Sequence, residues 1–193
     1  MNIETARFNM IEQQIRPWEV LDGQVLSLLS IVKRENFVPL AHKALAFADM
    51  EIPLQASGSK GQCMLAPKVE ARLLQNAAIQ PSDKVLEVGT GSGYMAALLA
   101  QQAASVLSFE IDPAIAQMAR TNLQNAGITN VEVRQADGSQ GAPNDGPFDV
   151  IVLSGSVPEV PQHLLSQLKL GGRLLAVVGE DPVMRASVIT RKT

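Results

Sequence analysis

The chain has 193 residues, of which 46% are hydrophobic, 4% are aromatic and 18% are charged, with a formal net charge of -3. This length predicts one domain of ordinary size with room for an extra segment, and a charged fraction below the usual ~25% argues against a disordered chain or a coiled coil. The sequence has no cluster of four or more lysines and arginines, so we expect no nucleic-acid partner.

Membrane, disulfide and metal-binding classes are also disfavoured. The uncharged apolar runs are far too short to cross a bilayer, and the start shows no basic segment followed by an apolar one, so we expect a cytoplasmic protein with no membrane partner. A single cysteine, Cys63, excludes an internal disulfide and a multi-cysteine zinc site. The two histidines, His42 and His163, are too distant in sequence to suggest a metal site.

Residues 1–79 show helical patterns without a clear strand rhythm. The predicted elements are a helix over 6–15 that Pro17 ends, a helix over 19–32, an extended segment over 51–54, a loop over 55–62 and a helix over 66–78. This zone is expected to be a helical cap that covers a sheet, a substrate-binding region, or both.

Residues 80–193 alternate short apolar runs with helical patterns. The predicted strands are 84–88, 105–109, 131–133, 148–153 and 173–178, and the predicted helices are 93–101, 113–126 and 160–170. Helices between successive strands imply right-handed crossovers and a parallel sheet. We therefore predict an α/β, Rossmann-like, doubly wound and mainly parallel sheet that forms one compact unit with the cap. Ligands are expected at the carboxyl ends of its strands.

The strongest local signal is a glycine-rich loop, Gly89-Thr90-Gly91-Ser92-Gly93, directly after the first of these strands. Glycines allow a tight turn and a close approach of backbone amides to a ligand. The spacing does not fit a dinucleotide fingerprint, because Tyr94 stands where the third glycine would. No Lys-Ser/Thr pair follows, so a Walker-type phosphate loop is excluded as well.

Three successive predicted strands each end at an acidic residue, namely Glu87, Glu110 and Asp137. A carboxylate would repel a pyrophosphate, but it complements the ammonium and sulfonium of S-adenosylmethionine. Glu110 stands where an acid binds ribose hydroxyls, and Asp137 can reach an adenine edge. Single acids of this kind are often solvated turn residues, but all three together predict a pocket for this cofactor. Its expected residues are Glu87, Gly89, Thr90, Gly91, Ser92, Gly93, Glu110, Ile111, Asp137 and Gly138.

The run from Glu87 to Tyr94 resembles the first motif of class I S-adenosylmethionine-dependent methyltransferases. Along nearly the whole chain the sequence resembles the protein-L-isoaspartate O-methyltransferase family in particular. The matching segments are 10–15, 34–39, 48–49, 52–54, 130–131, 137–138, 147–149, 167–168, 171–174 and 178–179. The glycine loop indicates only the superfamily, whereas the N-terminal segments make the family match specific.

The resemblance implies methyl transfer from S-adenosylmethionine to the carboxylate of L-isoaspartyl residues in damaged proteins, which is a protein repair reaction. A carboxylate has a reference pKa of about 3.5 and is ionised at neutral pH, so no general base is required. Catalysis then consists of aligning the reacting atoms and excluding water. The resemblance assigns the region 55–67 to a protein or peptide substrate.

Within that region the sequence departs from the family pattern, in which Gly-Gln-Thr-Ile-Ser is expected. This chain reads Gly61-Gln62-Cys63-Met64-Leu65, so Leu65 replaces a serine whose hydroxyl should contact the substrate carboxylate or organise the site. No catalytic residue is therefore assigned. Isoaspartyl methylation could persist if Ser57 or Ser59 substitutes for that serine. The alternatives are a cofactor-binding homologue with a different acceptor or little isoaspartyl activity, and a binding protein without turnover.

A second departure lies at the C-terminus, where the family pattern continues with a closing pair of strands. Residues 184–190 can form at most one of them. The pair is therefore expected to be incomplete, with an unpaired apolar strand at an exposed edge. Either the chain is a truncated product, or this edge pairs with a second copy in a homodimer.

Overall fold

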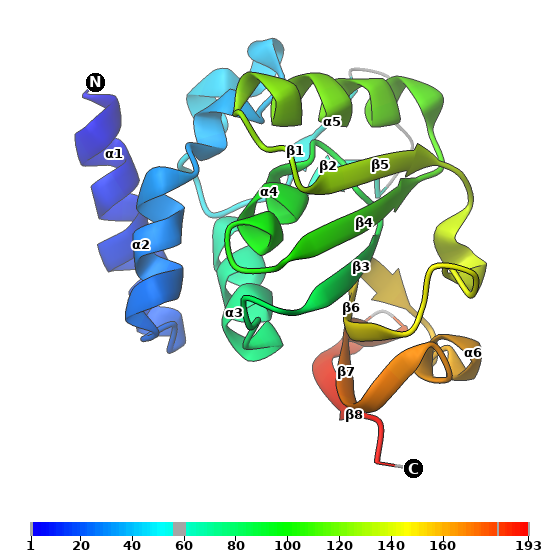
Figure 1. Ribbon diagram of the computed structural model, residues 1–193. Helices are drawn as coiled ribbons and strands as arrows, with labels where there is room; N and C mark the ends of the chain where they lie inside the picture. Colours follow the sequence, from blue (N-terminus) through cyan, green and yellow to red (C-terminus); the bar gives the residue numbers. More distant parts are fainter. Residues whose placement is uncertain (1, 56–60, 181, 193) are drawn as a thin grey trace.

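A six-stranded sheet in the order β5-β4-β3-β6-β7-β8 forms the centre of the computed structural model, which describes residues 2–55, 61–180 and 182–192 (Figure 1). The strands are β3 (Lys84–Val88), β4 (Ser105–Glu110), β5 (Val131–Gln135), β6 (Phe148–Val157), β7 (Leu168–Glu180) and β8 (Val183–Thr190). Neighbouring strands are parallel except β7 and β8, which are antiparallel. The predicted α/β, mainly parallel architecture is confirmed.

Helices cover the two faces of the sheet unequally (Figure 1). α3 (Pro67–Ala77), α4 (Tyr94–Ala100) and α5 (Pro113–Asn125) contribute with the N-terminal segment to one hydrophobic core. The short α6 (Gln162–Leu165) contributes to a second core. Val85 of β3 belongs to the first core and Leu86 to the second, so this strand is buried on both faces, as its continuous apolar run requires.

The order of the strands reverses next to β3. From β3 the chain moves to β4 and β5 on one side, and it then returns to β6 on the other side. In open parallel sheets such a reversal leaves a crevice at the carboxyl ends of two adjacent strands, where ligands bind. The glycine loop directly follows β3, so it lies at this crevice.

The N-terminal segment is helical but less regular than its pattern predicts. Its elements are α1 (Ile3–Met10), the π-helical η1 (Ile11–Ile15), α2 (Gly23–Ile31), the 3-10 helices η2 (Arg16–Trp18), η3 (Arg34–Asn36) and η4 (Leu40–Leu45), and the paired strands β1 (Ile52–Pro53) and β2 (Cys63–Met64). The run of α1 and η1 ends at Ile15, as predicted, and Pro17 lies in the 3-10 turn η2 that follows, where proline is tolerated because the first turn needs no backbone donor. The second helix begins at Gly23 and not at residue 19, because Asp22 caps it.

The N-terminal segment shares its core with the sheet. Met10 and Phe37 belong to the same buried cluster as Leu98 of α4 and Val150 of β6. The division of the chain into 1–79 and 80–193 stays a prediction. In the part of the chain that the structure describes, no helix combines the length and hydropathy needed to cross a membrane.

The predicted helix over 160–170 is confirmed only for residues 162–165 and is wrong beyond them. α6 ends at Leu165, and β7 begins at Leu168, which pairs with Phe148. The register then shifts, and the next pair is Val150 with Arg173. Gly171-Gly172 therefore belongs to an irregular part of β7 and does not end a helix. Pairing with β6 overrides the helical apolar pattern, because tertiary burial outweighs local propensity.

The prediction for the C-terminus is partly wrong. β8 pairs with β7 at every residue, from Val183 opposite Glu180 to Thr190 opposite Arg173, so it is not an unpaired strand. It is the last strand in the sheet order, and no other strand of the described residues pairs with its outer edge. One strand of the expected closing pair is therefore present, with Val188 exposed on it.

A substitution at Gly172 can test how tightly the irregular part of β7 is packed. A Cβ atom there would lie 2.9 Å from the backbone oxygens of Asp149 and Lys169, so Gly172→Ala is expected to lower the free energy of unfolding by about 1–3 kcal/mol. Gly23→Ala is the matched control, because a Cβ at Gly23 meets nothing within 4 Å and alanine there is neutral or stabilises by up to ~1 kcal/mol. Urea denaturation measures both variants, and equal stabilities would contradict the packing at Gly172.

Candidate functional site

Three glycines determine the shape of the loop after β3. Gly89, Gly91 and Gly93 have φ angles of 94°, 55° and 86°, which residues with a side chain rarely adopt. The amides of Gly89 and Thr90 donate to the backbone oxygen of Phe109 at 2.8 and 3.0 Å. The loop is thereby held across the carboxyl ends of β3 and β4, and α4 begins directly after it.

Glu87, two residues before the loop, is fully buried. One of its carboxylate oxygens accepts from Ser108 Oγ at 2.6 Å and the other from Ser154 Oγ at 2.8 Å, so the side chain connects β3 with β4 and β6. Burial raises the pKa of Glu87 to about 7, although the two hydroxyl hydrogen bonds favour the ionised form. Sequence reasoning missed both serines. The sequence feature that could have indicated them is a serine within an otherwise apolar strand, because a buried hydroxyl needs a hydrogen-bond partner.

Glu110, at the end of β4, supports the loop through its side chain. Its Oε2 accepts from the amide of Gly91 at 2.9 Å, and its Oε1 accepts from the amide of Asp112 at 3.1 Å. The next residue, Ile111, is 63% exposed. The mostly buried carboxylate of Glu110 and the exposed apolar side chain of Ile111 are therefore adjacent at the carboxyl end of β4.

Asp137, the third acid, is exposed and caps the 3-10 helix η5 (Gly138–Gln140). Its carboxylate accepts from the amide of Ser139 at 2.8 Å, and this hydrogen bond lowers the pKa of Asp137. A Cβ at Gly138 would lie 2.7 Å from Cγ1 of Val88 and 2.9 Å from Cβ of Phe109. The backbone after β5 therefore approaches β3 and β4 so closely that only glycine fits.

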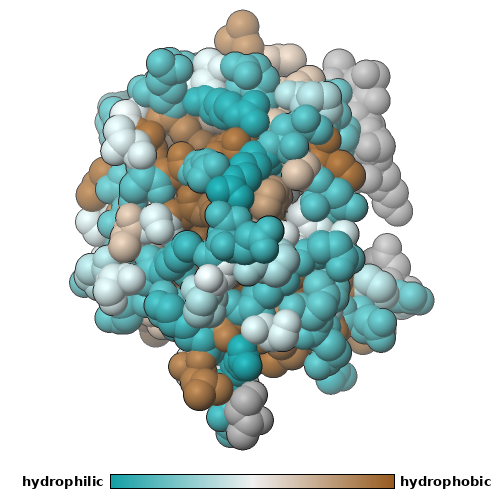
Figure 2. Space-filling model, turned by 45° about the vertical axis from the view of Figure 1, so that its right-hand side comes forward, coloured by the Kyte–Doolittle hydropathy of each residue, from teal (hydrophilic) through white to brown (hydrophobic). Residues whose placement is uncertain are grey.

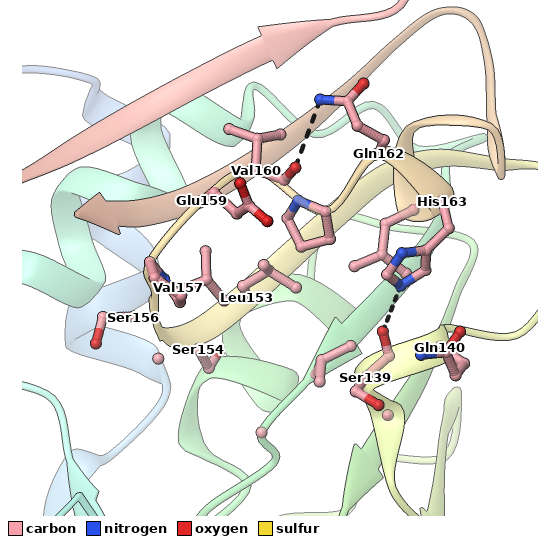
Figure 3. Close-up of a pocket in the computed structure, with 17 residues that line it drawn as sticks. Ser139, Gln140, Leu153, Ser154, Ser156, Val157, Glu159, Val160, Gln162 and His163 are labelled. Carbon is pink, nitrogen blue, oxygen red and sulfur yellow. Dashed lines mark hydrogen bonds between the residues drawn. The ribbon is translucent and has the colours of Figure 1, made fainter. Parts of the chain in front are cut away.

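A cavity of about 730 Å³ opens where β3 and β6 end (Figure 3). Gly89 and Gly138 line it, together with η5, the end of β6 and the segment that leads into α6. His163 Nε2 lies 2.6 Å from the backbone oxygen of Ser139, which joins α6 to η5 (Figure 3). In the view of Figure 2, most of the surface is hydrophilic, and hydrophobic surface lies both in recesses between hydrophilic residues and at protruding points.

The predicted cofactor residues are distributed around this cavity. Glu87, Glu110, Ile111 and Asp137 are not among its lining residues. Glu87 is fully buried and bound to the lining residue Ser154, whereas Glu110 ends β4, Ile111 follows it and Asp137 follows β5. Thr90, Gly91 and Ser92 line a second, smaller cavity. Gly93 lines neither and packs against α5, since a Cβ there would lie 3.2 Å from Leu123 Cγ.

The smaller cavity, of about 20 Å³, separates the glycine loop from Cys63, Met64 and Leu65. The structure therefore brings the predicted substrate loop against the predicted cofactor loop. The side-chain nitrogens of Gln55 and Gln62 each lie 3.4 Å from Oδ2 of Asp112. Residues 56–60, with Ser57 and Ser59, lie outside the described residues.

Among the described residues we considered the Cys63 thiol as a nucleophile and groups of side chains as metal ligands. Burial raises the pKa of the Cys63 thiol to about 11, with a further contribution from Glu51, whose Oε2 lies 3.5 Å from Sγ. The thiol is therefore protonated at neutral pH and a poor nucleophile. Within the described ranges no three histidine, cysteine, aspartate or glutamate side chains are grouped so that they could hold a metal ion.

The burial of Glu87 predicts how stability depends on pH. Folding raises its pKa from 4.5 to about 7, so its contribution to stability is largest at low pH and falls as the pH rises through about 7. We expect Glu87→Gln to raise the free energy of unfolding by on the order of 3 kcal/mol near pH 8.5, and by much less near pH 5. Urea denaturation at both pH values measures this difference. An equal effect at the two pH values would contradict the raised pKa.

Comparisons with known proteins agree with this geometry. The family model for protein-L-isoaspartate(D-aspartate) O-methyltransferase matches residues 5–193. The protein-L-isoaspartate O-methyltransferase of Methanoculleus marisnigri is 44% identical over 173 residues, which cover 90% of this chain and 77% of the relative. The enzyme of the same name from Koribacter versatilis is 41% identical over 186 residues, which cover 96% of this chain and 82% of the relative.

Solved structures show the same fold. A protein-L-isoaspartate O-methyltransferase structure is 25% identical with a TM-score of 0.80, covering 98% of this chain and 60% of that chain. A Plasmodium falciparum structure in complex with S-adenosyl-L-homocysteine is 19% identical with a TM-score of 0.81, covering 100% of this chain and 91% of that chain, and at this identity it shows the fold alone. On the family match and the two relatives, this chain belongs to the protein-L-isoaspartate(D-aspartate) O-methyltransferase family.

Proposed function

We propose that this protein transfers the methyl group of S-adenosylmethionine to the carboxylate of L-isoaspartyl residues in damaged proteins or peptides, and so acts in protein repair. The observation that carries the proposal is the cavity where the glycine loop meets the end of β6, next to the buried carboxylate of Glu87. The curated relatives are named for the same reaction. They give no support to a different acceptor or to a protein without turnover.

The residues around the cavity fit a cationic adenosyl ligand. None of those that line it is lysine or arginine, whereas Glu159 lines it, so a phosphate would meet a carboxylate there and no ammonium or guanidinium group. A nearby cation would stabilise the ionised form of the buried Glu87. When bound, the cofactor supplies a methyl group on a sulfonium.

Each predicted cofactor residue has a proposed part in holding the ligand. We assign Glu87 to the cationic amino-acid portion, Glu110 to the ribose and Asp137 to the adenine edge. The remaining residues would contact the ligand through the backbone or as apolar surface; they are Gly89, Thr90, Gly91, Ser92, Gly93, Ile111 and Gly138.

The rest of the chemistry requires only that this chain holds and aligns the reactants. An acceptor carboxylate is already ionised at neutral pH, so the absence of a histidine base from the proposal is no objection. Residues 63–65 face the glycine loop across the small cavity. In that position the loop can align the acceptor with the cofactor and exclude water.

Leu65 decides how fast this reaction proceeds. Its side chain packs against the hydrophobic core and cannot donate a hydrogen bond to a carboxylate. We expect wild-type protein to methylate an isoaspartyl peptide slowly, and Leu65→Ser to raise kcat/KM by roughly 10- to 100-fold, since a hydrogen bond to a charged group is worth about 1.5–3 kcal/mol.

Leu65→Ala is the matched control, because it removes the leucine without adding a hydroxyl. Transfer of a labelled methyl group to an isoaspartyl peptide, compared with the aspartyl peptide of the same sequence, measures all three proteins. An equal gain from serine and alanine would contradict a role of the hydroxyl. No transfer by any of the three proteins would overturn the proposed acceptor.

Glu110 tests the cofactor part of the proposal. Glu110→Gln keeps the shape of the side chain but removes the charge and one acceptor, so we expect the Kd for S-adenosylmethionine to rise roughly 10- to 100-fold. Glu132→Gln is the control, because Glu132 lies near the start of β5, away from the carboxyl ends of the strands. Calorimetry measures both. A wild-type Kd for Glu110→Gln would remove this residue from the cofactor site.

Three further properties complete the proposal. We expect a cytoplasmic location. We also expect no nucleic-acid partner, because the chain has a net charge of -3 and no cluster of four or more lysines and arginines. We also expect a homodimer through the outer edge of β8, where Val183 and Val188 are exposed. Light scattering that finds only monomers at high concentration would contradict the dimer.

A further inference from the structure

Arg34 is the largest of the fully buried side chains, and the proposed reaction has not assigned it a role. It forms an ion pair with Glu70 of α3, which is also buried. Taking two charges out of water is costly, and apolar residues of similar volume often stabilise a fold equally well. Stability alone therefore does not account for an arginine at this position.

Each side of the guanidinium is directed at a different segment of the chain. Nη1 contacts the Glu70 carboxylate, Nη2 donates to the backbone oxygen of Leu65 at 2.9 Å, and Nε donates to the backbone oxygen of Ala46 at 3.0 Å. The carbon Cζ lies 5.2 Å from the centre of the Tyr94 ring. Because the guanidinium is planar and rigid, these partners determine its position and orientation together.

Two of these partners belong to opposite sides of the candidate site. Leu65 lines the small cavity from the substrate loop, and Tyr94 lines it from the first turn of α4, directly after Gly93. Glu70 also lines it, from α3. One guanidinium therefore contacts both the substrate loop and the helix that starts at the glycine loop.

The side chain of Leu65 has no polar atom. A hydrogen bond can therefore fix this residue only through its backbone, and Arg34 binds its carbonyl oxygen. We propose that Arg34 is a positioning residue that sets the place of the substrate loop relative to the glycine loop by binding the Leu65 carbonyl. The effect on the reaction rests on the proposed function, whereas the effect on the loop does not. Arg34 acts through the loop and does not contact the reacting atoms.

The sharpest test replaces both charges with apolar residues, in the variant Arg34→Met/Glu70→Leu. No buried charge is left unpaired in it, so the fold is retained, but the carbonyls of Leu65 and Ala46 lose their donor. We expect amide hydrogen exchange over residues 61–66 to become at least ~10-fold faster, and the KM for an isoaspartyl peptide to rise about 10-fold or more. The Kd for S-adenosylmethionine should change less than the KM, because the glycine loop keeps its own hydrogen bonds to Phe109 and Glu110, although Glu70 lines the small cavity.

The matched control is Arg7→Met/Glu35→Leu. Arg7 is also a buried arginine paired with a buried glutamate, and it also lies over an aromatic ring, that of Phe47 at 5.9 Å. Its hydrogen-bond partners are Glu4 and Glu35, neither of which belongs to the substrate loop. This variant should show wild-type exchange over 61–66 and a wild-type KM. If the Arg34 variant does not fold, Arg34→Lys replaces it, because lysine keeps the charge but loses the planar fork.

The two measurements separate the possible failures. If exchange over 61–66 in the Arg34 variant equals that of the Arg7 control, the positioning role is overturned. A fall in kcat alone, with unchanged KM and unchanged exchange, would indicate a structural role and would also overturn it. If wild-type protein methylates no isoaspartyl peptide, the proposed function fails, while the exchange experiment still decides the role of Arg34.

Discussion

The carboxylate of Glu87 joins the three strands whose ends build the candidate site. It is fully buried on β3, and it accepts one hydroxyl hydrogen bond from Ser108 on β4 and another from Ser154 on β6. A buried carboxylate without a countercharge is unfavourable, which is why its pKa rises to about 7. A cationic ligand next to the glycine loop would supply the missing charge. The same interaction therefore links the order of the strands to the chemistry of the ligand.

Close approach of backbones is the second constraint on the site. A Cβ at Gly89 would lie 3.3 Å from the backbone oxygen of Ser154, so the first glycine of the loop is packed against the end of β6. Gly138 is enclosed still more tightly by Val88 and Phe109. The N-terminal segment completes the arrangement from the other side, where Arg34 binds the Leu65 carbonyl. A site of this kind depends on distances between main chains as much as on its side chains.

The elements that the sequence predicts best are those whose signals are local. The strand over 84–88 is confirmed residue for residue as β3, because a short apolar run stands between turn residues and a glycine cluster. The predicted helix over 160–170 is too long, because residues 168–170 belong to β7. The pairing of Leu168 with Phe148 has no local signal in the sequence. Ser108, Ser154 and Arg34 were not assigned for a similar reason. Their partners lie between 12 and 67 residues away in sequence.

The sequence by itself determined the class of fold, the glycine loop, the three acids at strand ends and the family resemblance, since residue type and short spacing encode these features. It also showed that Leu65 replaces an expected serine. Only the tertiary structure decided that Glu87 is buried between two hydroxyls, that β8 is paired, and that a guanidinium donates to the main chain of the predicted substrate loop at Leu65. Burial and hydrogen bonding between distant segments exist only after the sheet and the cap have packed together, because a side chain's solvent and partners are properties of the folded chain.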